Sequence, residues 1–211
     1  CYQLLGGKYR DKVRIYADTP EPEEPTPEAY AQRVLGRKEM GLTFIKFDAR
    51  LQTLEEIPGA MVGTPTKFEY PINARSRAAG TGQVVKITEK GFQALADIVA
   101  MVRETVDWDV SLCIDHYGHG YLTTKEVIKL ASYLEPYALS WMEDPMPSLD
   151  LWGHKRVTDA VNVPIAGGED LYLWDEFQPF IENRAVDIIH PDLLTSGGMT
   201  ETKRISDYAE R

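Results

Sequence analysis

The chain has 211 residues, of which 43% are hydrophobic and 10% aromatic, enough to bury one sizeable core. Its formal net charge of −10 argues against nucleic acid and anionic membranes as partners, because their phosphates would be repelled. Two cysteines give no disulfide framework, and no apolar run is long enough to cross a bilayer, so we expect a cytoplasmic protein.

The first predicted strands lie between the start of the chain and residue 50. The opening CYQLLGGKYRDK lacks an initiator Met and reads like the interior of a longer polypeptide. KVRIYAD (12–18) is typical of a strand, and a Pro-rich loop then leads into a helix. FIKFDAR (44–50) is the next strand-like run.

A long irregular stretch follows over 51–83. A loop of this length inside a compact domain is uncommon and is usually either functional or disordered. Its Arg75 could bind a carboxylate through two parallel hydrogen bonds if the loop folded over an active site. We leave open whether it is such a lid or a disordered surface excursion.

Strands and helices then alternate regularly. A helix is predicted over 88–106, where apolar residues share one face: Phe92, Leu95, Ile98, Val99 and Val102. Thr123 and Glu126 have capping-box spacing at the start of another helix. Further strand-like runs are 110–115, 138–144, 163–170 and 186–192, each followed by a helix-like run. Six β-α units in alternation predict a parallel sheet covered by helices.

An open doubly wound sheet and a (β/α) barrel both fit this alternation. No phosphate-binding glycine motif follows the first strand, which weakens the nucleotide-binding forms of the open sheet. Five successive strands end in ionisable groups, namely Lys46 and Asp48, Asp115 and His116, Glu143 and Asp144, Glu169 and Asp170, and His190 and Asp192. In a barrel, these ends converge on one mouth, which is where active sites lie.

Asp115, Glu143 and Glu169 are spaced at about one β-α unit, so we expect equivalent positions on neighbouring strands. Three clustered carboxylates cannot all stay ionised in a desolvated pocket unless a cation lies among them. Hard oxygen ligands of this kind suit Mg²⁺. A single strand-end carboxylate is more often a helix cap, and we assign Asp144 and Asp170 to capping or supporting roles.

These residues, in this order, resemble the barrel domain of the enolase superfamily, in its mandelate racemase/muconate-lactonizing branch. The pattern is K-x-D, then D, E-D-P and G-G-E on three consecutive strands, then H-P-D-L-L-T-S-G-G-M-T-E. The resemblance implies an α/β fold, a (β/α) barrel that is here incomplete, with about six β-α units over 12–211. The last strands and an N-terminal capping domain would be absent, and residues 1–11 would be the junction from that domain.

The resemblance also implies roles for single residues. It implies Mg²⁺ ligation by Asp115, Glu143 and Glu169. Lys46 matches the family's acid/base lysine, whereas Asp48 replaces a second lysine and is assigned to substrate binding. Asp192 matches the Asp of an Asp–His dyad whose His would lie on the next strand.

The histidines and their neighbours are less specific. His116 and His119 follow the first predicted ligand, and a catalytic role or an ordinary loop position fits both. We take His116 as a candidate acid, and Tyr117 and His119 as candidate substrate contacts. His190 is interpreted as a packed or supporting group, and His154 as a surface residue of an outer helix.

The chemistry implied by the resemblance is removal of a proton α to a carboxylate, through an enediolate that a divalent ion stabilises. We therefore predict a Mg²⁺-dependent sugar-acid dehydratase, a hydro-lyase that acts on a small-molecule carboxylate as a homo-oligomer. Alternatives within the superfamily are a cycloisomerase and a racemase or epimerase, which the K-x-D departure disfavours. A metal-independent barrel glycosidase and a non-catalytic fragment are alternatives from other classes.

Overall fold

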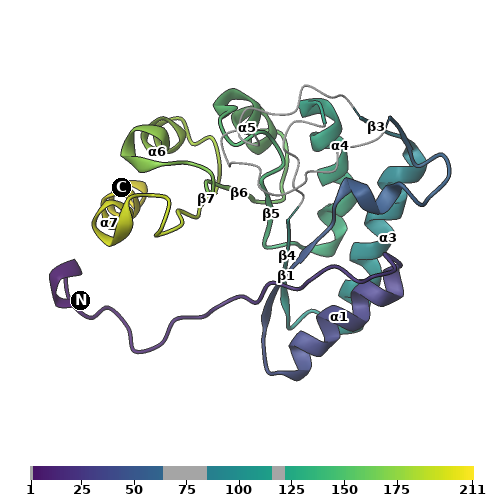
Figure 1. The fold of residues 1–211 in the computed structure, drawn as a ribbon, viewed down its shortest axis with the longest axis horizontal. Coiled ribbons are helices and arrows are strands. Elements are labelled where there is room, and N and C mark those ends of the chain that lie inside the picture. The colour runs from purple at the N-terminus through teal and green to yellow at the C-terminus, as the bar shows by residue number, and fades with distance from the viewer. Residues whose placement is uncertain (1, 64–84, 116–121) are drawn as a thin grey trace.

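The computed structural model describes residues 2–63, 85–115 and 122–211, which form a parallel sheet covered by helices (Figure 1). The strands of this sheet are β1 (Phe44–Asp48), β4 (Ser111–Asp115), β5 (Trp141–Glu143), β6 (Ile165–Gly167) and β7 (Ile188–Ile189). The α-helices are α1 (Pro27–Glu39), α3 (Glu89–Val106), α4 (Thr124–Leu134), α5 (Leu151–Thr158), α6 (Leu173–Glu182) and α7 (Gly198–Ala209). Short 3-10 turns lie at Tyr2–Leu5, Leu51–Leu54 and Glu135–Tyr137. Within the described ranges, no helix is both long and apolar enough to cross a membrane.

The five strands pair in the order β1-β4-β5-β6-β7, and every pair is parallel. A helix connects each strand to the next, because parallel neighbours need a crossover connection. The predicted alternation is therefore confirmed from β1 onward, although the strands are shorter than the apolar runs suggested. All five carboxyl ends lie along one edge of the sheet.

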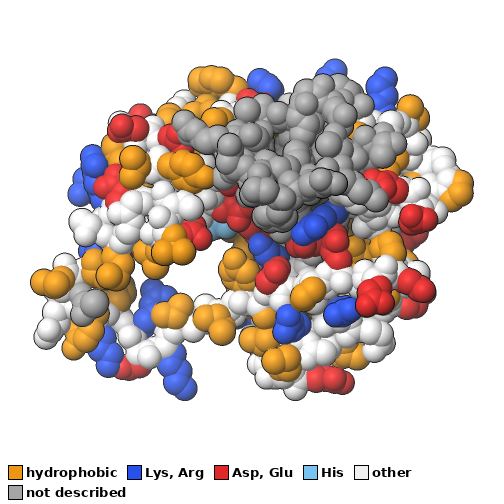
Figure 2. Space-filling model, viewed as in Figure 1, with side chains coloured by type: hydrophobic (Ala, Val, Ile, Leu, Met, Phe, Trp, Pro, Cys, Tyr) orange, Lys and Arg blue, Asp and Glu red, His pale blue; other side chains and the backbone are white. Residues whose placement is uncertain are grey.

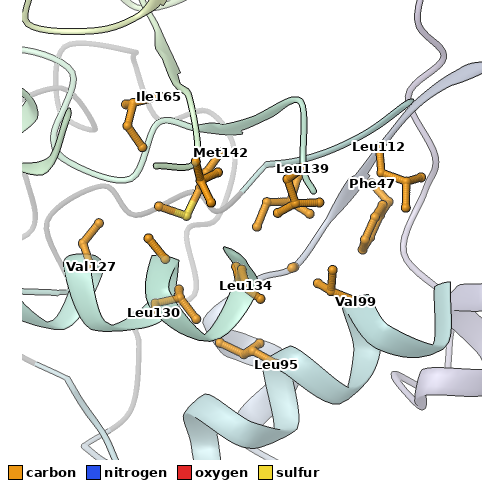
Figure 3. Close-up of a cluster of buried hydrophobic side chains, with 14 of the residues drawn as sticks. Phe47, Leu95, Val99, Leu112, Val127, Leu130, Leu134, Leu139, Met142 and Ile165 are labelled. Atoms are coloured by element: carbon orange, nitrogen blue, oxygen red, sulfur yellow. The ribbon is translucent and has the colours of Figure 1, made fainter. Parts of the chain in front are cut away.

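One face of the sheet packs against α3 and α4 and forms the main hydrophobic core (Figure 3). The strands contribute Phe47, Leu112, Met142 and Ile165, and the helices contribute Leu95, Val99, Val127, Leu130 and Leu134. The apolar stripe predicted for 88–106 is confirmed, since each of its residues is buried in α3. Burial of this stripe is the main force that holds the helices on the sheet.

The other face of the sheet carries the alternate residues of the same strands, because successive side chains on a strand point to opposite faces. A second buried cluster lies there, made of Cys113, Trp141 and Ala166 with Phe44 and Ile188 packed against it. The same alternation places the last residues of β4 and β5 on this inner face, above the apolar cluster. The candidate site therefore has an apolar floor.

The predicted capping box at the start of α4 is confirmed. The Thr123 hydroxyl accepts a hydrogen bond from the Glu126 N–H at 3.4 Å, and the Thr123 N–H donates to Glu126 Oε2 at 3.0 Å. Each side chain thus satisfies a backbone donor that the first turn of a helix leaves unpaired.

The strand predicted over 12–18 is wrong. The structure has only an isolated bridge, in which Ala17 makes two backbone hydrogen bonds to β1, of 3.1 and 2.8 Å. Val13 and Ile15 are 70% and 67% exposed, so the apolar alternation that suggested a strand has no neighbour to pair with in the described chain. The predicted first β-α unit is therefore a single bridge followed by α1.

The long segment predicted at 51–83 is described only in part, since residues 64–84 lie outside the described chain. On either side of those residues, β2 (Met61–Val62) pairs antiparallel with β3 (Lys86–Ile87). The two flanks of the insertion therefore lie side by side, next to the start of α3. This small ribbon was not predicted from the sequence.

Candidate metal centre

The register of the sheet brings carboxylates to one level at its carboxyl edge. Asp48 lies opposite Asp115, and Asp115 lies opposite Glu143. Glu143 is paired with Ala166, however, so Glu169 follows three residues after the equivalent position on β6. The predicted equivalence thus holds for Asp115 and Glu143 but not for Glu169.

Glu169 reaches the site because the chain turns sharply after β6. Gly168 has φ +122°, a left-handed conformation that favours glycine, and a Cβ there would lie 2.9 Å from the Phe177 ring. This turn brings Glu169 close to the end of β5. Glu143, Asp144 and Glu169 each offer one carboxylate oxygen, and the three oxygens lie within 4.8 Å of one another. The structure therefore groups Asp144, rather than Asp115, with the two glutamates.

Asp144 is more deeply placed than a helix-capping residue. It has φ +44° and is 1% exposed, and neither carboxylate oxygen has a hydrogen-bond partner among the described residues. Burial raises the pKa of Asp144 well above its usual range, and the charges of Asp115 and Glu169 add to the rise. A buried carboxylate without a donor is destabilising unless a proton or a cation neutralises it.

Lys46 supplies a positive charge to this group. Its Nζ lies 3.2 Å from Asp115 Oδ2 and 3.0 Å from Glu143 Oε1, and all three side chains are buried. Burial alone would lower the pKa of Lys46, but the attraction of Asp115 and Glu143 outweighs it and raises the pKa well above its usual value. In this arrangement Lys46 is protonated, which is the opposite of the depressed pKa expected for a base.

Glu143 has two further polar neighbours, of which Trp141 donates a hydrogen bond. The Trp141 indole N–H donates to Glu143 Oε2 at 2.9 Å, and His190 Nδ1 lies 3.5 Å from Oε1. Burial lowers the pKa of His190, an effect that Glu143 opposes and Lys46 reinforces. His190 therefore supports the site from β7, as its sequence position suggested.

Asp48 is paired with an arginine. Arg50 Nη2 donates to Asp48 Oδ2 at 2.6 Å, and Arg50 Nε lies 3.3 Å from Glu21 Oε1. Burial raises the pKa of Asp48 to about 6, although Arg50 pulls it down. Arg50 and Glu21 were not identified from the sequence as neighbours of the site. Only the short spacing between Asp48 and Arg50 could have indicated that these two side chains pair.

Asp115 and Asp170 complete the acidic group. Burial raises the pKa of Asp115, and the Glu143 carboxylate raises it further while Lys46 opposes the rise. Asp170 is buried and accepts a hydrogen bond from the Ser148 hydroxyl at 3.2 Å. Figure 2 shows acidic side chains and a histidine beside an opening in this face of the molecule.

Asp192 has hydrogen-bond partners outside this group. Asp192 is exposed beyond β7, where its Oδ1 accepts hydrogen bonds from the N–H groups of Leu194 (2.6 Å) and Thr195 (3.4 Å). Its predicted part in a dyad stays a prediction. Four other predicted site residues lie outside the described residues, namely Arg75, His116, Tyr117 and His119.

His154, expected on the surface, is buried at 1% exposure, and that expectation is wrong. Its ring packs edge-on against Phe180, and its Nδ1 lies 3.0 Å from the Asp150 carbonyl oxygen. Burial lowers the pKa of His154. The side chain of His154 lies on the inner face of α5, whereas its sequence position suggested the solvent face.

The donor set fits a hard divalent cation. Carboxylate oxygens dominate it, and the unpartnered oxygens of Asp144 lie in the same group as Glu143 and Glu169. Lys46 and His190 lie against Glu143, and Arg50 lies against Asp48. Oxygen-rich sites with excess negative charge are those that Mg²⁺ and Ca²⁺ occupy in proteins.

Comparison with known proteins identifies the family. Residues 71–211 match the family described as enolase C-terminal domain-like. A D-xylonate dehydratase from Haloferax volcanii is 36% identical over 211 residues, which are 100% of this chain and 45% of that protein. A D-galactonate dehydratase family member from Cellvibrio japonicus is 31% identical over 209 residues, which are 99% of this chain and 49% of that protein.

A solved structure supports the same assignment. The crystal structure of a member of the enolase superfamily from Salmonella Typhimurium is similar with a TM-score of 0.78 and 28% identity, over 99% of this chain and 50% of that one. The chain spans about half the length of the curated relatives it matches. The chain belongs to the enolase superfamily, and its parallel sheet and helices match the barrel domain of that superfamily.

Proposed function

We propose that this chain provides the metal-binding part of a Mg²⁺-dependent sugar-acid dehydratase. The observation that carries the proposal is the group of buried and half-buried carboxylates at the carboxyl edge of the sheet, in a chain whose relatives include a D-xylonate dehydratase. Because the chain spans about half the length of such relatives, the activity is proposed for the full-length protein.

Glu143 and Glu169 are the first candidates to hold the ion, since their oxygens already lie within 4.8 Å of each other and of an Asp144 oxygen. Asp115 is the third ligand that the family resemblance implies, and it is paired with Glu143 in the sheet. When bound, Mg²⁺ would supply positive charge to a substrate carboxylate as the neighbouring carbon loses its proton.

The chain's own residues would do the remaining work. Lys46 projects from β1 beside the proposed ligands, so its Nζ is placed to receive the α-proton once the ammonium has lost its own proton to solvent. Loss of the β-hydroxyl as water, with a proton from an acid such as His116, gives an enol that becomes a 2-keto-3-deoxy acid. Asp48, held by Arg50, would contact substrate hydroxyl groups, with Arg75, Tyr117 and His119 as further proposed contacts.

The proposal predicts which assay detects turnover. Full-length protein should convert at least one five- or six-carbon sugar acid, such as D-xylonate or D-galactonate, to a 2-keto acid in the presence of Mg²⁺. A chelator should abolish this turnover, and added Mg²⁺ should restore it. The corresponding uncharged sugars serve as controls, because they lack the carboxylate that the metal would bind.

Two outcomes would contradict the proposal. One is 2-keto acid formation that survives exhaustive chelation, which would remove the metal from the reaction. The other is absence of turnover across the panel together with metal-independent hydrolysis of a glycoside, which would favour paired-carboxylate chemistry.

A further inference from the structure

The ammonium group of Lys46 lies where a cation is needed. Its Nζ is 3.2 Å from Asp115 Oδ2 and 3.0 Å from Glu143 Oε1, with the lysine side chain 9% exposed and each carboxylate 1% exposed. These are hydrogen-bonding distances to two carboxylates of the proposed metal site. A buried cation thus neutralises part of the acidic group by itself.

We propose that Lys46 is a stand-in cation that neutralises Asp115 and Glu143 when no metal is bound and competes with the metal for them. The inference rests on the proposed metal site but not on the identity of the substrate. It adds a second role to Lys46, one that ends when the metal binds.

Competition follows from the small number of oxygen atoms available. Glu143 Oε1 already faces both Lys46 and His190, and Glu143 Oε2 accepts the indole N–H of Trp141. A metal ion that takes Glu143 as a ligand must therefore displace at least part of this hydrogen bonding. Two cations also repel each other at such short range, so binding of the metal pushes the ammonium away.

The displaced ammonium has a place to go on the same face. The Tyr16 ring centroid lies 5.7 Å from Lys46 Nζ, within the range of a cation–π interaction. Tyr16 is itself held edge-on by Phe44 and Trp141, and it is 41% exposed. A small rotation of the lysine side chain would move the charge away from the carboxylates and toward this ring.

This exchange gives the reaction an order. While Lys46 is hydrogen-bonded to Asp115 and Glu143, it is not free to approach a substrate carbon. A bound metal would therefore free Lys46 from these carboxylates, and its positive charge would favour loss of the ammonium proton to solvent, which leaves the neutral amine needed for proton transfer.

The test measures metal affinity rather than turnover. Calorimetric titration of full-length protein with Mn²⁺ and with Mg²⁺ compares wild type with Lys46→Met and Lys46→Arg. The neutral variant should bind metal about tenfold more tightly or better, because no internal cation has to be displaced. Lys46→Arg keeps the charge and should stay near the wild-type affinity. Lys129→Met, which removes an exposed lysine paired with Glu89, controls for the loss of one positive charge.

Thermal unfolding supplies an independent readout. Without metal, Lys46→Met should melt at a lower temperature than wild type, because two buried carboxylates lose their counter-ion. On addition of Mn²⁺, its melting temperature should rise by more than that of wild type, since a ligand that binds more tightly stabilises the folded state more at the same concentration. Unchanged or weaker metal binding by a folded Lys46→Met protein would overturn the proposal.

If Lys46→Met does not fold, crystal structures of the wild-type full-length protein with and without Mn²⁺ decide. Lys46 Nζ should leave at least one of the two carboxylates in the metal complex, and retention of both contacts would contradict the inference. Failure of the dehydratase assay would leave these binding results untouched. Absence of any Mg²⁺ or Mn²⁺ binding to wild type would remove the metal site and the proposal together.

Discussion

At the carboxyl end of the sheet, buried carboxylates crowd together, whereas at the amino end a buried arginine is surrounded by backbone carbonyl groups. Arg103, 3% exposed, donates hydrogen bonds of 2.7–3.3 Å to the carbonyl oxygens of Asp107, Val110, Tyr137 and Ala138. At the other end, Asp144 is as deeply buried and has no hydrogen-bond partner among the described residues. Both ends bury charge, but the arginine at the amino end is hydrogen-bonded, whereas the carboxyl end holds a buried carboxylate, Asp144, without a partner among the described residues.

The difference separates stability from function. The carbonyls that Arg103 binds belong to the segments that lead into β4 and β5. Two of these carbonyls are those of Asp107 (φ +65°) and Ala138 (φ +48°), whose positive φ values are strained for residues other than glycine. One side chain thus fixes two strained loops. In parallel α/β barrels the carboxyl end of the strands holds the active site and the amino end serves stability, which matches this division.

The largest expected effect is on the function of the carboxylate end. Glu143→Gln keeps the size of the side chain and removes one charge from the proposed ligand group. We expect kcat/KM of the full-length enzyme to fall by at least about a thousandfold, because charge stabilisation at a reacting carboxylate is among the largest catalytic terms. Steady-state kinetics measure the loss, and circular dichroism should show an intact fold. Near-normal turnover by this variant would remove Glu143 from the metal site.

The next effect is on stability and comes from the amino end. Arg103→Met keeps much of the side-chain volume and leaves four carbonyl groups without their donor. We expect a loss of about 3 kcal/mol in the free energy of unfolding, measured by urea denaturation. Arg156→Met, which changes an exposed arginine on α5, is the matched control and should be nearly neutral. Equal effects of the two changes would abolish the contrast between the ends.

The sequence was sufficient for features that depend on local pattern. The buried stripe of α3, the capping box of α4 and the strand runs that carry Asp115 and Glu143 were all predicted and are confirmed. Each follows from residues within one helix or along one strand. The 12–18 run shows the limit of such patterns, because a strand also needs a partner that its own residues do not specify.

The details of the site depend on contacts between distant residues, which local pattern does not contain. Lys46 meets Asp115 and Glu143 across 69 and 97 positions of the chain. Asp144 points toward the acidic group because of a positive φ, and His154 is buried because of the face that α5 presents to the sheet. The assignment of ligands from the family resemblance is a prediction that the kinetic and binding measurements will decide.

The smallest predicted effect is on the pH dependence of the free energy of unfolding, to which the carboxylate end of the sheet should contribute. Because burial raises the pKa of Asp48 from 3.8 to about 6, the folded protein holds this proton more tightly than the unfolded chain does. The ionised carboxylate therefore destabilises the fold, and stability falls as pH rises from 3.8 to about 6. Asp48→Asn should remove this cost and raise the free energy of unfolding by about 1 kcal/mol near pH 7.5.

The same variant should give no gain near pH 3, where Asp48 is protonated in both states. Urea denaturation of wild type and Asp48→Asn at the two pH values measures the difference. Asp97→Asn removes an exposed charge from α3 and controls for the general effect of reducing a net charge of −10. A gain that is the same at both pH values would show that Asp48 does not titrate in this range. In that case the hydrogen bond from Arg50 would outweigh the effect of burial on the pKa of Asp48. Asp48 would then be a paired buried charge, like Arg103 at the amino end of the sheet.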